Sequence, residues 1–317
     1  MLPFIARRIA LFVPTLLGVS VVIFGLLYLV PGDPLSSLLP PDASQEQRDR
    51  VAHALGFDQP VPIQYLQWLG RVAHGDFGTS LARNRPVGAM LGEAVANTMV
   101  LAAAAGVLAL VLGLALGTLA AVRHGTLTDR LVRVVSVTGV SVPSYWAVLL
   151  LITVFAVQLH WLPASGMRSV TGDGGPGDLL AHLVLPALAA SMVTLGLMAR
   201  MVRTSVLDVL NQDYVLTLRA KGMGAAAILA HTLKNAAPPI MTVGGLQIGH
   251  LLAGSVLVET VCGWPGVGQL IYQSISQRDV PVTQGGVLAV ALVFVVLNLI
   301  VDLLHGVVDP RIRQASH

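Results

Sequence analysis

Charged residues are scarce in this chain: Asp, Glu, Lys and Arg together make up 11% of its 317 residues. A soluble globular protein carries about 25%, because its surface must be hydrated. Hydrophobic residues reach 55%, and the mean hydropathy is +0.76. These values exclude soluble, disordered, collagen-like and disulfide-framework proteins and leave a polytopic membrane protein. With so few charges, the net charge of +3 indicates topology rather than nucleic-acid binding. We therefore expect the lipid bilayer, and no nucleic acid, as a partner.

Residues for disulfide, nucleotide and metal chemistry are equally rare. Cys262 is the one cysteine and cannot form an internal disulfide. Lys221 follows an alanine and Lys234 follows a leucine, so the Gly-Lys-Ser/Thr of a Walker A loop is absent. His-Glu-x-x-His, Gly-x-Ser-x-Gly and metal-spaced clusters are absent too. We expect no enzyme activity, metal or cofactor in this chain, and any ATP hydrolysis that drives it belongs to another chain.

Long uncharged segments are what the sequence has in abundance. A membrane-spanning helix needs about 20 apolar residues, because the hydrocarbon core is about 30 Å thick. Six segments qualify, namely 9–32, 94–122, 134–159, 179–199, 235–258 and 280–301. In lipid an open chain satisfies every backbone group only as helix. The first segment is too long for the core of a signal peptide, so we expect it to be retained. The sequence predicts an all-α membrane protein with six transmembrane helices.

Positive charges orient this bundle. Cytoplasmic loops of membrane proteins are enriched in lysine and arginine. With a cytoplasmic N-terminus, 12 of the 19 basic residues fall inside. They are Arg7, Arg8, Arg123, Arg130, Arg133, Arg200, Arg203, Arg219, Lys221, Lys234, Arg311 and Arg313. Both termini are therefore predicted to be cytoplasmic.

A long polar segment, 33–93, then lies outside the membrane after the first span. Pro60 and Pro62 suit the start of a short amphipathic helix that includes Ile63 and Trp68, and Gly75 lies just beyond it. Two interpretations stay open for this segment. It is either a small cap on the bundle or a gate or docking platform.

The cytoplasmic loop between the fourth and fifth spans is the most informative feature. The pattern predicts a helix to about Leu218, a break at Gly222 and Gly224, and a second short helix over 225–234. The Pro-Pro pair at 238 is expected to begin the return into the membrane. Such a loop either presents a compact knob to the cytoplasm or is an ordinary interfacial helix.

Polar residues at membrane depth are candidate functional groups. Glu259 falls near the outer end of the fifth span, and Asn298 and Asp302 lie one turn apart near the inner end of the sixth. They are either proton-relay groups or structural partners at span ends. Gly113 and Gly117 form a small-residue ridge that favours helix packing within the chain over a dimer interface.

Seven short motifs occur in order along the chain. They are Val30-Pro-Gly-Asp-Pro34; Leu55-Gly-Phe-Asp-Gln-Pro60 with Gln64-Tyr-Leu-Gln-Trp-Leu69; Gly75-Asp-Phe-Gly-Thr-Ser80; Trp161-Leu-Pro-Ala-Ser-Gly166; Arg219-Ala-Lys-Gly222; Gly254-Ser-Val-Leu-Val-Glu259 running into Trp264-Pro-Gly-Val-Gly268; and Asn298-Leu-Ile-Val-Asp302 with Asp309-Pro-Arg311. On these motifs the chain resembles the permease subunits of bacterial binding-protein-dependent ABC importers. The branch it resembles transports dipeptides, oligopeptides and nickel.

The resemblance implies the fold, the location and the partners. It implies a type I ABC importer permease fold in the bacterial inner membrane. The N-terminal helix and external segment would occupy 1–93, a five-helix permease core 94–308, and a cytoplasmic tail 309–317. The implied partners are a second related permease, two cytoplasmic ATPases that bind ATP and Mg²⁺, and an extracytoplasmic substrate-binding protein. In this arrangement the chain forms half of the translocation pathway.

The resemblance also assigns the cytoplasmic loop to ATPase coupling. The implied coupling residues are Arg219, Ala220, Lys221, Gly222, Gly224, Ala225, Ala226, Ala227, Leu229 and His231. The family's Glu-Ala-Ala-x-x-x-Gly pattern is only partly kept. Gly222 takes the glycine, whereas residues 216–218 are Leu-Thr-Leu. A role that needs that glutamate is therefore in doubt, while the docking role stands.

Alternatives remain open for the substrate and the energy source. The resembled branch favours peptides, with nickel, glutathione or another small solute as the alternative. A proton-coupled secondary transporter using Glu259 and Asp302 is a second class, but such proteins usually show internal inverted repeats. An intramembrane enzyme is disfavoured, because no catalytic motif is present.

Overall fold

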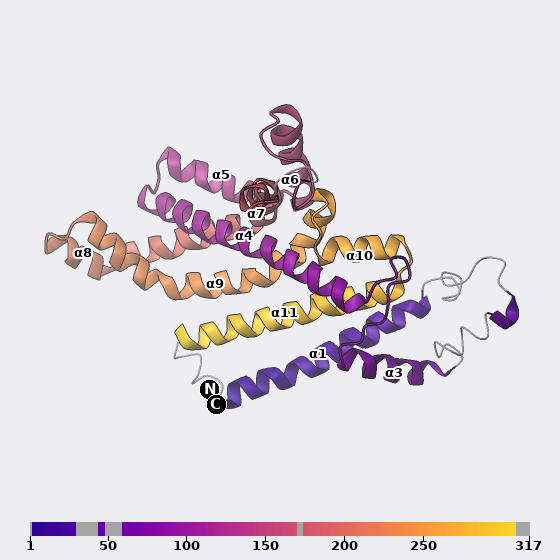
Figure 1. Cartoon of the computed structure of the whole chain (residues 1–317). Coiled ribbons are helices and arrows are strands. Elements are labelled where there is room, and N and C mark those ends of the chain that lie inside the picture. Colours follow the sequence, from indigo (N-terminus) through magenta and orange to yellow (C-terminus); the bar gives the residue numbers. More distant parts are fainter. Residues whose placement is uncertain (1, 30–43, 48–58, 170–173, 309–317) are drawn as a thin grey trace. The chain divides into compact units, whose positions relative to one another are not determined.

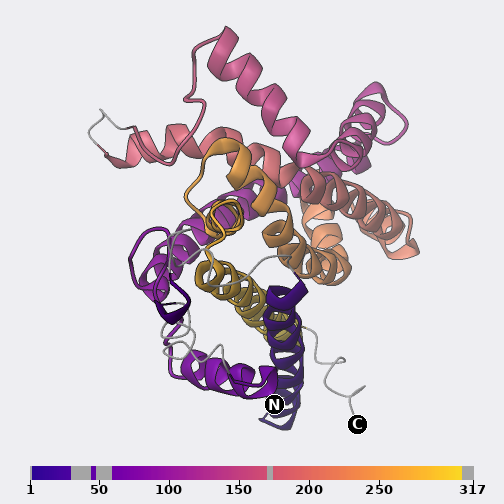
Figure 2. The ribbon, with the colours of Figure 1, turned by 90° about the vertical axis from the view of Figure 1, so that its right-hand side faces the viewer.

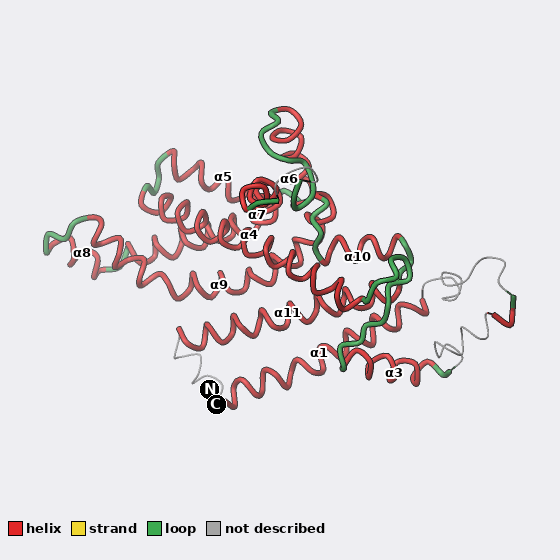
Figure 3. The backbone as a smooth tube through the Cα atoms, viewed as in Figure 1, coloured by secondary structure: helices red, strands yellow, loops and turns green. Residues whose placement is uncertain are grey.

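The computed structural model describes residues 2–29, 44–47, 59–169 and 174–308. Within these ranges the regular structure is helical (Figure 3), and Thr79 and Pro86 form an isolated β-bridge. The helices are α1 (Leu2–Leu29), α3 (Val61–Ala73), α4 (Val87–Val122), α5 (Leu127–Ser141), α6 (Ser144–Leu151), the π-helical η2 (Ile152–Gln158), α7 (Pro176–Leu210), α8 (Asp213–Ala220), α9 (Ala225–Cys262), α10 (Val267–Ser276) and α11 (Val280–Val308). The all-α prediction is confirmed. The predicted tail, 309–317, and much of the predicted external segment lie outside the described residues.

Two compact units share the chain. The larger unit comprises Thr98–Trp264 and the chain from Val296, and the smaller one comprises Leu2–Asn97 and Pro265–Val295. The helices α4 and α11 each contribute to both. The candidate coupling loop belongs to the larger unit.

Helix α7 is the central element of the larger unit, where it packs against α5, α6 and α9. Glycines bring the neighbouring backbones close to it. A Cβ on Gly117 of α4 would lie 2.5 Å from the Ala199 carbonyl oxygen and 2.7 Å from the Val202 Cβ. A Cβ on Gly113 would lie 2.7 Å from the Met198 Cβ. The predicted glycine ridge therefore packs within the chain.

The third predicted span, 134–159, is not a straight helix. Helix α5 ends at Ser141, and α6 with η2 leaves it at an angle of 110°. The change of direction can be followed in Figure 2. The cause is Pro143, which disfavours helical backbone in the residue before it. Val142 accordingly has φ −84° and ψ 123°, which is an extended conformation.

The second short helix predicted over 225–234 is not a separate element either. It forms the first turns of α9, which continues through Pro238 and Pro239 to Cys262. Proline usually breaks a helix because it removes a backbone hydrogen bond and clashes with the preceding turn. Here both prolines, and the Lys234 and Asn235 carbonyls that they cannot bond, lie on an exposed face. Solvent or headgroups can therefore replace the two lost bonds.

Three described helices are long and apolar enough to cross a membrane: α4, α7 and Val280–Val301 of α11. A fourth is found if α5 with α6 and η2 counts as one bent span, and Phe12–Gly25 of α1 is a shorter apolar helix. The described residues of all six predicted spans are helical apart from the break at Val142 and Pro143 and the last residue of the third span, Leu159. The count of six spans and the orientation of the termini stay predictions.

The smaller unit contains the amphipathic helix predicted after Pro60, which is α3. Its aromatic side chains contact α1, where the Phe24 ring centroid lies 5.4 Å from that of Tyr65 and 5.5 Å from that of Trp68. The Ser20 and Tyr65 hydroxyls share a hydrogen bond of 2.8 Å. These contacts attach the external helix to the first predicted span.

We predict that Gly117→Ala destabilises the chain by about 1–3 kcal/mol, because the added methyl must push α4 away from the α7 backbone. Gly92→Ala is the matched control, since Gly92 lies in the same helix with nothing within 4 Å of its Cβ position. The midpoint of thermal unfolding in detergent measures both. Equal midpoints for the two variants would contradict close packing between α4 and α7.

Candidate functional site

The corner between α8 and α9 forms the candidate coupling site. Helix α8 continues two residues beyond the predicted end and stops at Ala220. The Gly222 N–H donates to the Arg219 carbonyl, 2.9 Å, and Gly222 has φ +76°, a left-handed conformation that favours glycine. Gly224 then caps the start of α9 with extended backbone. The predicted glycine break is thereby confirmed.

Most predicted coupling residues lie on the surface of this corner. The exposed ones are Arg219, Ala220, Lys221, Gly222, Gly224, Ala225, Ala226, Ala227 and His231, and Leu229 is half-buried. Val215 and Ile228 are buried and anchor the two helices. The Asn235 amide also donates to the Tyr214 hydroxyl, 2.8 Å. The corner therefore presents a smooth alanine-rich surface on a fixed base, at the same end of the larger unit as the turn between α4 and α5 (Figure 1).

Glu259 lies in the last turns of α9 and is fully buried. Its Oε1 accepts a hydrogen bond from the Thr98 hydroxyl of α4, 2.8 Å, and a longer one from the Ser255 hydroxyl, 3.5 Å. Helix α9 ends in a left-handed turn at Gly263, with φ +62°, and the next residue, Trp264, is fully buried. Glu259 thus joins the last turns of α9 to α4 at Thr98.

The other two polar candidates are not brought to this site by any described contact. Asn298 is half-buried in α11. Asp302 also lies in α11, and its side chain is outside the described residues. No group of three or more His, Cys, Asp or Glu side chains in the described ranges is arranged to hold a metal ion.

A buried ion pair between α5 and α7 is one feature that the sequence did not reveal. Asp129, with 1% of its surface exposed, accepts two hydrogen bonds from Arg203, at 2.6 and 2.9 Å. The Gly125 N–H donates a third, 3.1 Å. Asp129 and Arg133 are four residues apart, a spacing that favours an ion pair within one helix. No such spacing relates Asp129 to Arg203, which lies 74 residues away along the chain.

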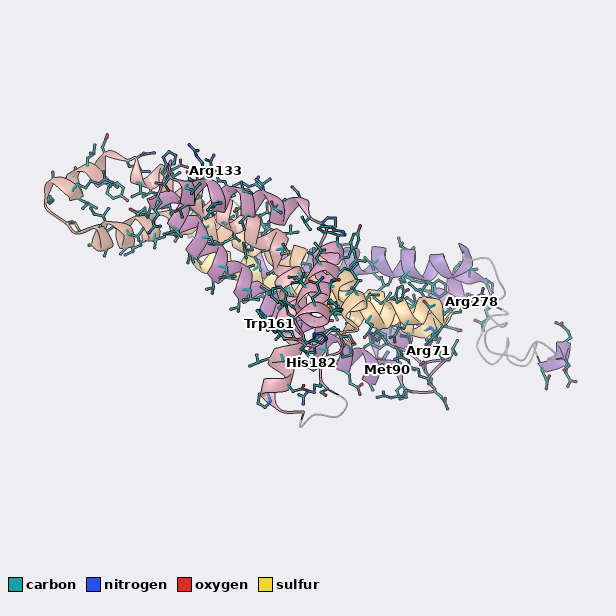
Figure 4. All side chains as sticks on the ribbon, turned by 90° about the horizontal axis from the view of Figure 1, so that it is seen from above. Arg71, Met90, Arg133, Trp161, His182 and Arg278 are labelled. Carbon is teal, nitrogen blue, oxygen red and sulfur yellow. The ribbon has the colours of Figure 1, made fainter. Side chains whose placement is uncertain are left out.

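The smaller unit holds a second buried carboxylate. Asp279, at the start of α11, accepts hydrogen bonds from the Ser80 hydroxyl and from the Ala82 N–H. Arg278 beside it is labelled in Figure 4 and has φ +55°. The Gly75–Ser80 motif was singled out from the sequence, but its carboxylate partner was not.

Comparisons with known proteins cover nearly the whole chain. Residues 113–314 match the family described as binding-protein-dependent transport system inner membrane component, and residues 1–114 match the N-terminal family of such membrane components. The di/tripeptide transport system permease protein DppB of Pseudomonas aeruginosa is 40% identical, with 99% of each chain covered. The dipeptide permease DppB of Escherichia coli K12 is 38% identical, with 99% of each covered. The oligopeptide permease AppB of Bacillus subtilis is 38% identical over 99% of this chain and all of its own.

A solved structure shows the same fold. One chain of the inward-facing MetNI methionine ABC transporter superposes with a TM-score of 0.53 at 20% identity. The match covers 72% of this chain and 96% of that one. The chain described here belongs to the family of inner membrane components of binding-protein-dependent transport systems.

Proposed function

We propose that this chain forms half of the translocation pathway of an ATP-driven importer for di- or oligopeptides. The observation that carries the proposal is the identity of 38–40% over nearly the whole length of both chains to curated peptide permeases. The transported class goes beyond family membership, so it needs its own test. Nickel, glutathione or another small solute is the alternative cargo.

The proposed machinery places ATP and Mg²⁺ on two partner ATPase subunits. The α8–α9 corner seats in a cleft on one of them and transmits its movement to the spans. Three features support this role: the corner is exposed, its glycine break gives it a fixed shape, and Val215 and Ile228 anchor it. A second related permease completes the pathway, and an extracytoplasmic binding protein delivers the substrate.

Glu259 is proposed to be a structural partner rather than a proton carrier. Its carboxylate is fully buried and accepts hydrogen bonds from Thr98 and Ser255. A buried polar group that is hydrogen-bonded stabilises the packing of the helices it joins, whereas a proton carrier needs access to water on both sides of its cycle. The burial therefore favours the structural role.

The function is tested by uptake in vesicles that contain the full transporter with its binding protein. We expect a labelled dipeptide to accumulate with ATP inside, and to continue to accumulate when a protonophore removes the proton gradient. Labelled nickel and glutathione are the comparison cargoes. Uptake of either in place of the dipeptide would overturn the peptide assignment, and uptake abolished by the protonophore would overturn the ATP-driven mechanism.

We predict that Gly222→Trp and Ala226→Arg leave the chain in the membrane at normal levels but uncouple it from its ATPase. A side chain at φ +76° strains the backbone by about 1 kcal/mol or more, and a bulky or charged group obstructs seating. The readouts are co-purification with the ATPase and substrate-stimulated ATP hydrolysis.

Gly75→Trp is the control for backbone strain, since Gly75 has φ +81° with open space around it and lies outside the corner. It should retain co-purification with the ATPase. If both corner variants also kept wild-type co-purification and stimulated hydrolysis, the corner would not be the coupling element.

We predict that Glu259→Gln slows uptake only partly, by about twofold to tenfold, because glutamine can still accept the Thr98 hydrogen bond. Glu259→Leu, which removes the acceptor, should lower the thermal midpoint as well. Uptake lost completely in Glu259→Gln, with assembly and ATP hydrolysis intact, would instead show that the ionised carboxylate is needed for transport.

A further inference from the structure

The seam between α5 and α7 carries more positive than negative charge. Asp129 is its buried acid, and Arg203 uses both carboxylate oxygens. Arg133 is 54% exposed, with its Nε 3.6 Å from the same carboxylate. Arg130 and Arg200 are exposed, and their guanidinium groups form no hydrogen bond or ion pair with the described part of the chain. Asp129 therefore pairs with two arginines, and Arg130, Arg133 and Arg200 keep donors available to a ligand.

Two contacts fix how α5 and α7 lie against each other. A Cβ on Gly196 would meet the Ser136 carbonyl oxygen, and Arg203 bonds Asp129. From the first contact to the second, the α7 residue advances from 196 to 203 while the α5 residue goes back from 136 to 129, so the two helices are antiparallel. Because Arg200 lies between Gly196 and Arg203, it falls at the level of the α5 turn between Asp129 and Ser136. That turn contains Arg133.

Both arginines also lie on the same side of the seam. Ala199 and Val202 face α4 through Gly117, and successive residues of an α-helix are turned by about 100°. Around the axis of α7, the contact with α5 therefore lies between the side that faces α4 and the side that carries Arg200. The same spacing on the antiparallel α5 puts Arg133 on that side too, and Figure 4 shows Arg133 on the outer surface of its helix.

Apolar surface continues from these arginines toward the predicted membrane interior. The uncharged segments end at residue 199 on α7 and begin at residue 134 on α5, so Arg200 and Arg133 are the first charges at this membrane edge. One turn deeper on α5, Val137 is 56% exposed, and Val134 is 62% exposed. Paired cations at the interface above an exposed apolar face match a phospholipid with an anionic headgroup.

We propose that the α5–α7 seam binds the phosphate of an anionic phospholipid between Arg133 and Arg200, with an acyl chain along Val134 and Val137. Guanidinium groups bind phosphate through charge-assisted hydrogen bonds, and each basic residue at a membrane edge adds attraction for anionic lipid. The lipid would hold α5 and α7 together beside the buried Asp129–Arg203 pair. A free phosphate ion would not use the apolar face, so the apolar face beside the arginines favours a lipid.

The test is native mass spectrometry of the full chain in neutral detergent, titrated with phosphatidylglycerol or with phosphatidylcholine of the same acyl chains. The wild type should retain phosphatidylglycerol in preference. The double variant Arg133→Gln with Arg200→Gln should bind it about tenfold to thirtyfold more weakly. The double lysine variant should keep most of the affinity, because it keeps the charge.

Arg278→Gln is the matched control, since it removes one exposed arginine from another part of the chain. It should bind phosphatidylglycerol as the wild type does. If the double variant fails to fold, Arg200→Gln alone carries the test, because the Arg200 side chain has no described partner to lose. That single change should weaken binding about fivefold.

Three results would overturn the proposal. The first is equal phosphatidylglycerol binding by the wild type and the glutamine variants. The second is displacement of the lipid by millimolar inorganic phosphate, which would indicate an anion site without a lipid component. The third is loss of ATPase co-purification from the Arg200→Gln variant in phosphatidylcholine alone, which would indicate that the seam faces the ATPase.

Discussion

Close approach of neighbouring backbones to α7 is the constraint on which the larger unit depends. Lipid removes the hydrophobic driving force between helices, so the helices associate through packing and through polar contacts. Gly113 and Gly117 of α4 and Gly139 of α5 supply the packing, and a Cβ at any of the three would come within 3 Å of α7 atoms. These contacts lie at residues 192–202, in the middle of the 35-residue helix α7.

Polar contacts then fix the two ends of the packed helices. Glu259 joins α9 to α4 at one end, and Asp129 with Arg203 joins α5 to α7 near the other. Removing one partner of a buried ion pair is far more damaging than the pair's net contribution suggests, because a buried charge is left unpaired. These contacts hold α9 against α4 and α5 against α7.

Local signals in the sequence predicted the all-α class, the glycine break and the helix after Pro60. They could not predict features that depend on distant residues. Nothing near Asp129 points to Arg203, and nothing near the Gly75–Ser80 motif points to Asp279. Proline also acts differently at two places in the chain. Pro143 bends the third predicted span by 110°, whereas Pro238 and Pro239 leave α9 continuous because they fall on an exposed face.

Cysteine cross-linking can detect whether the α8–α9 corner seats on an ATPase, as proposed. The native Cys262 is buried, so a cysteine introduced at Ala226 is the accessible one at this corner. A short bifunctional reagent should join it to the ATPase subunit in the assembled transporter, with a yield that changes when ATP binds. Ile228→Cys, at a position with 7% exposure, should give little product. Absence of any ATPase adduct from position 226, in a transporter that still hydrolyses ATP on substrate addition, would contradict the account.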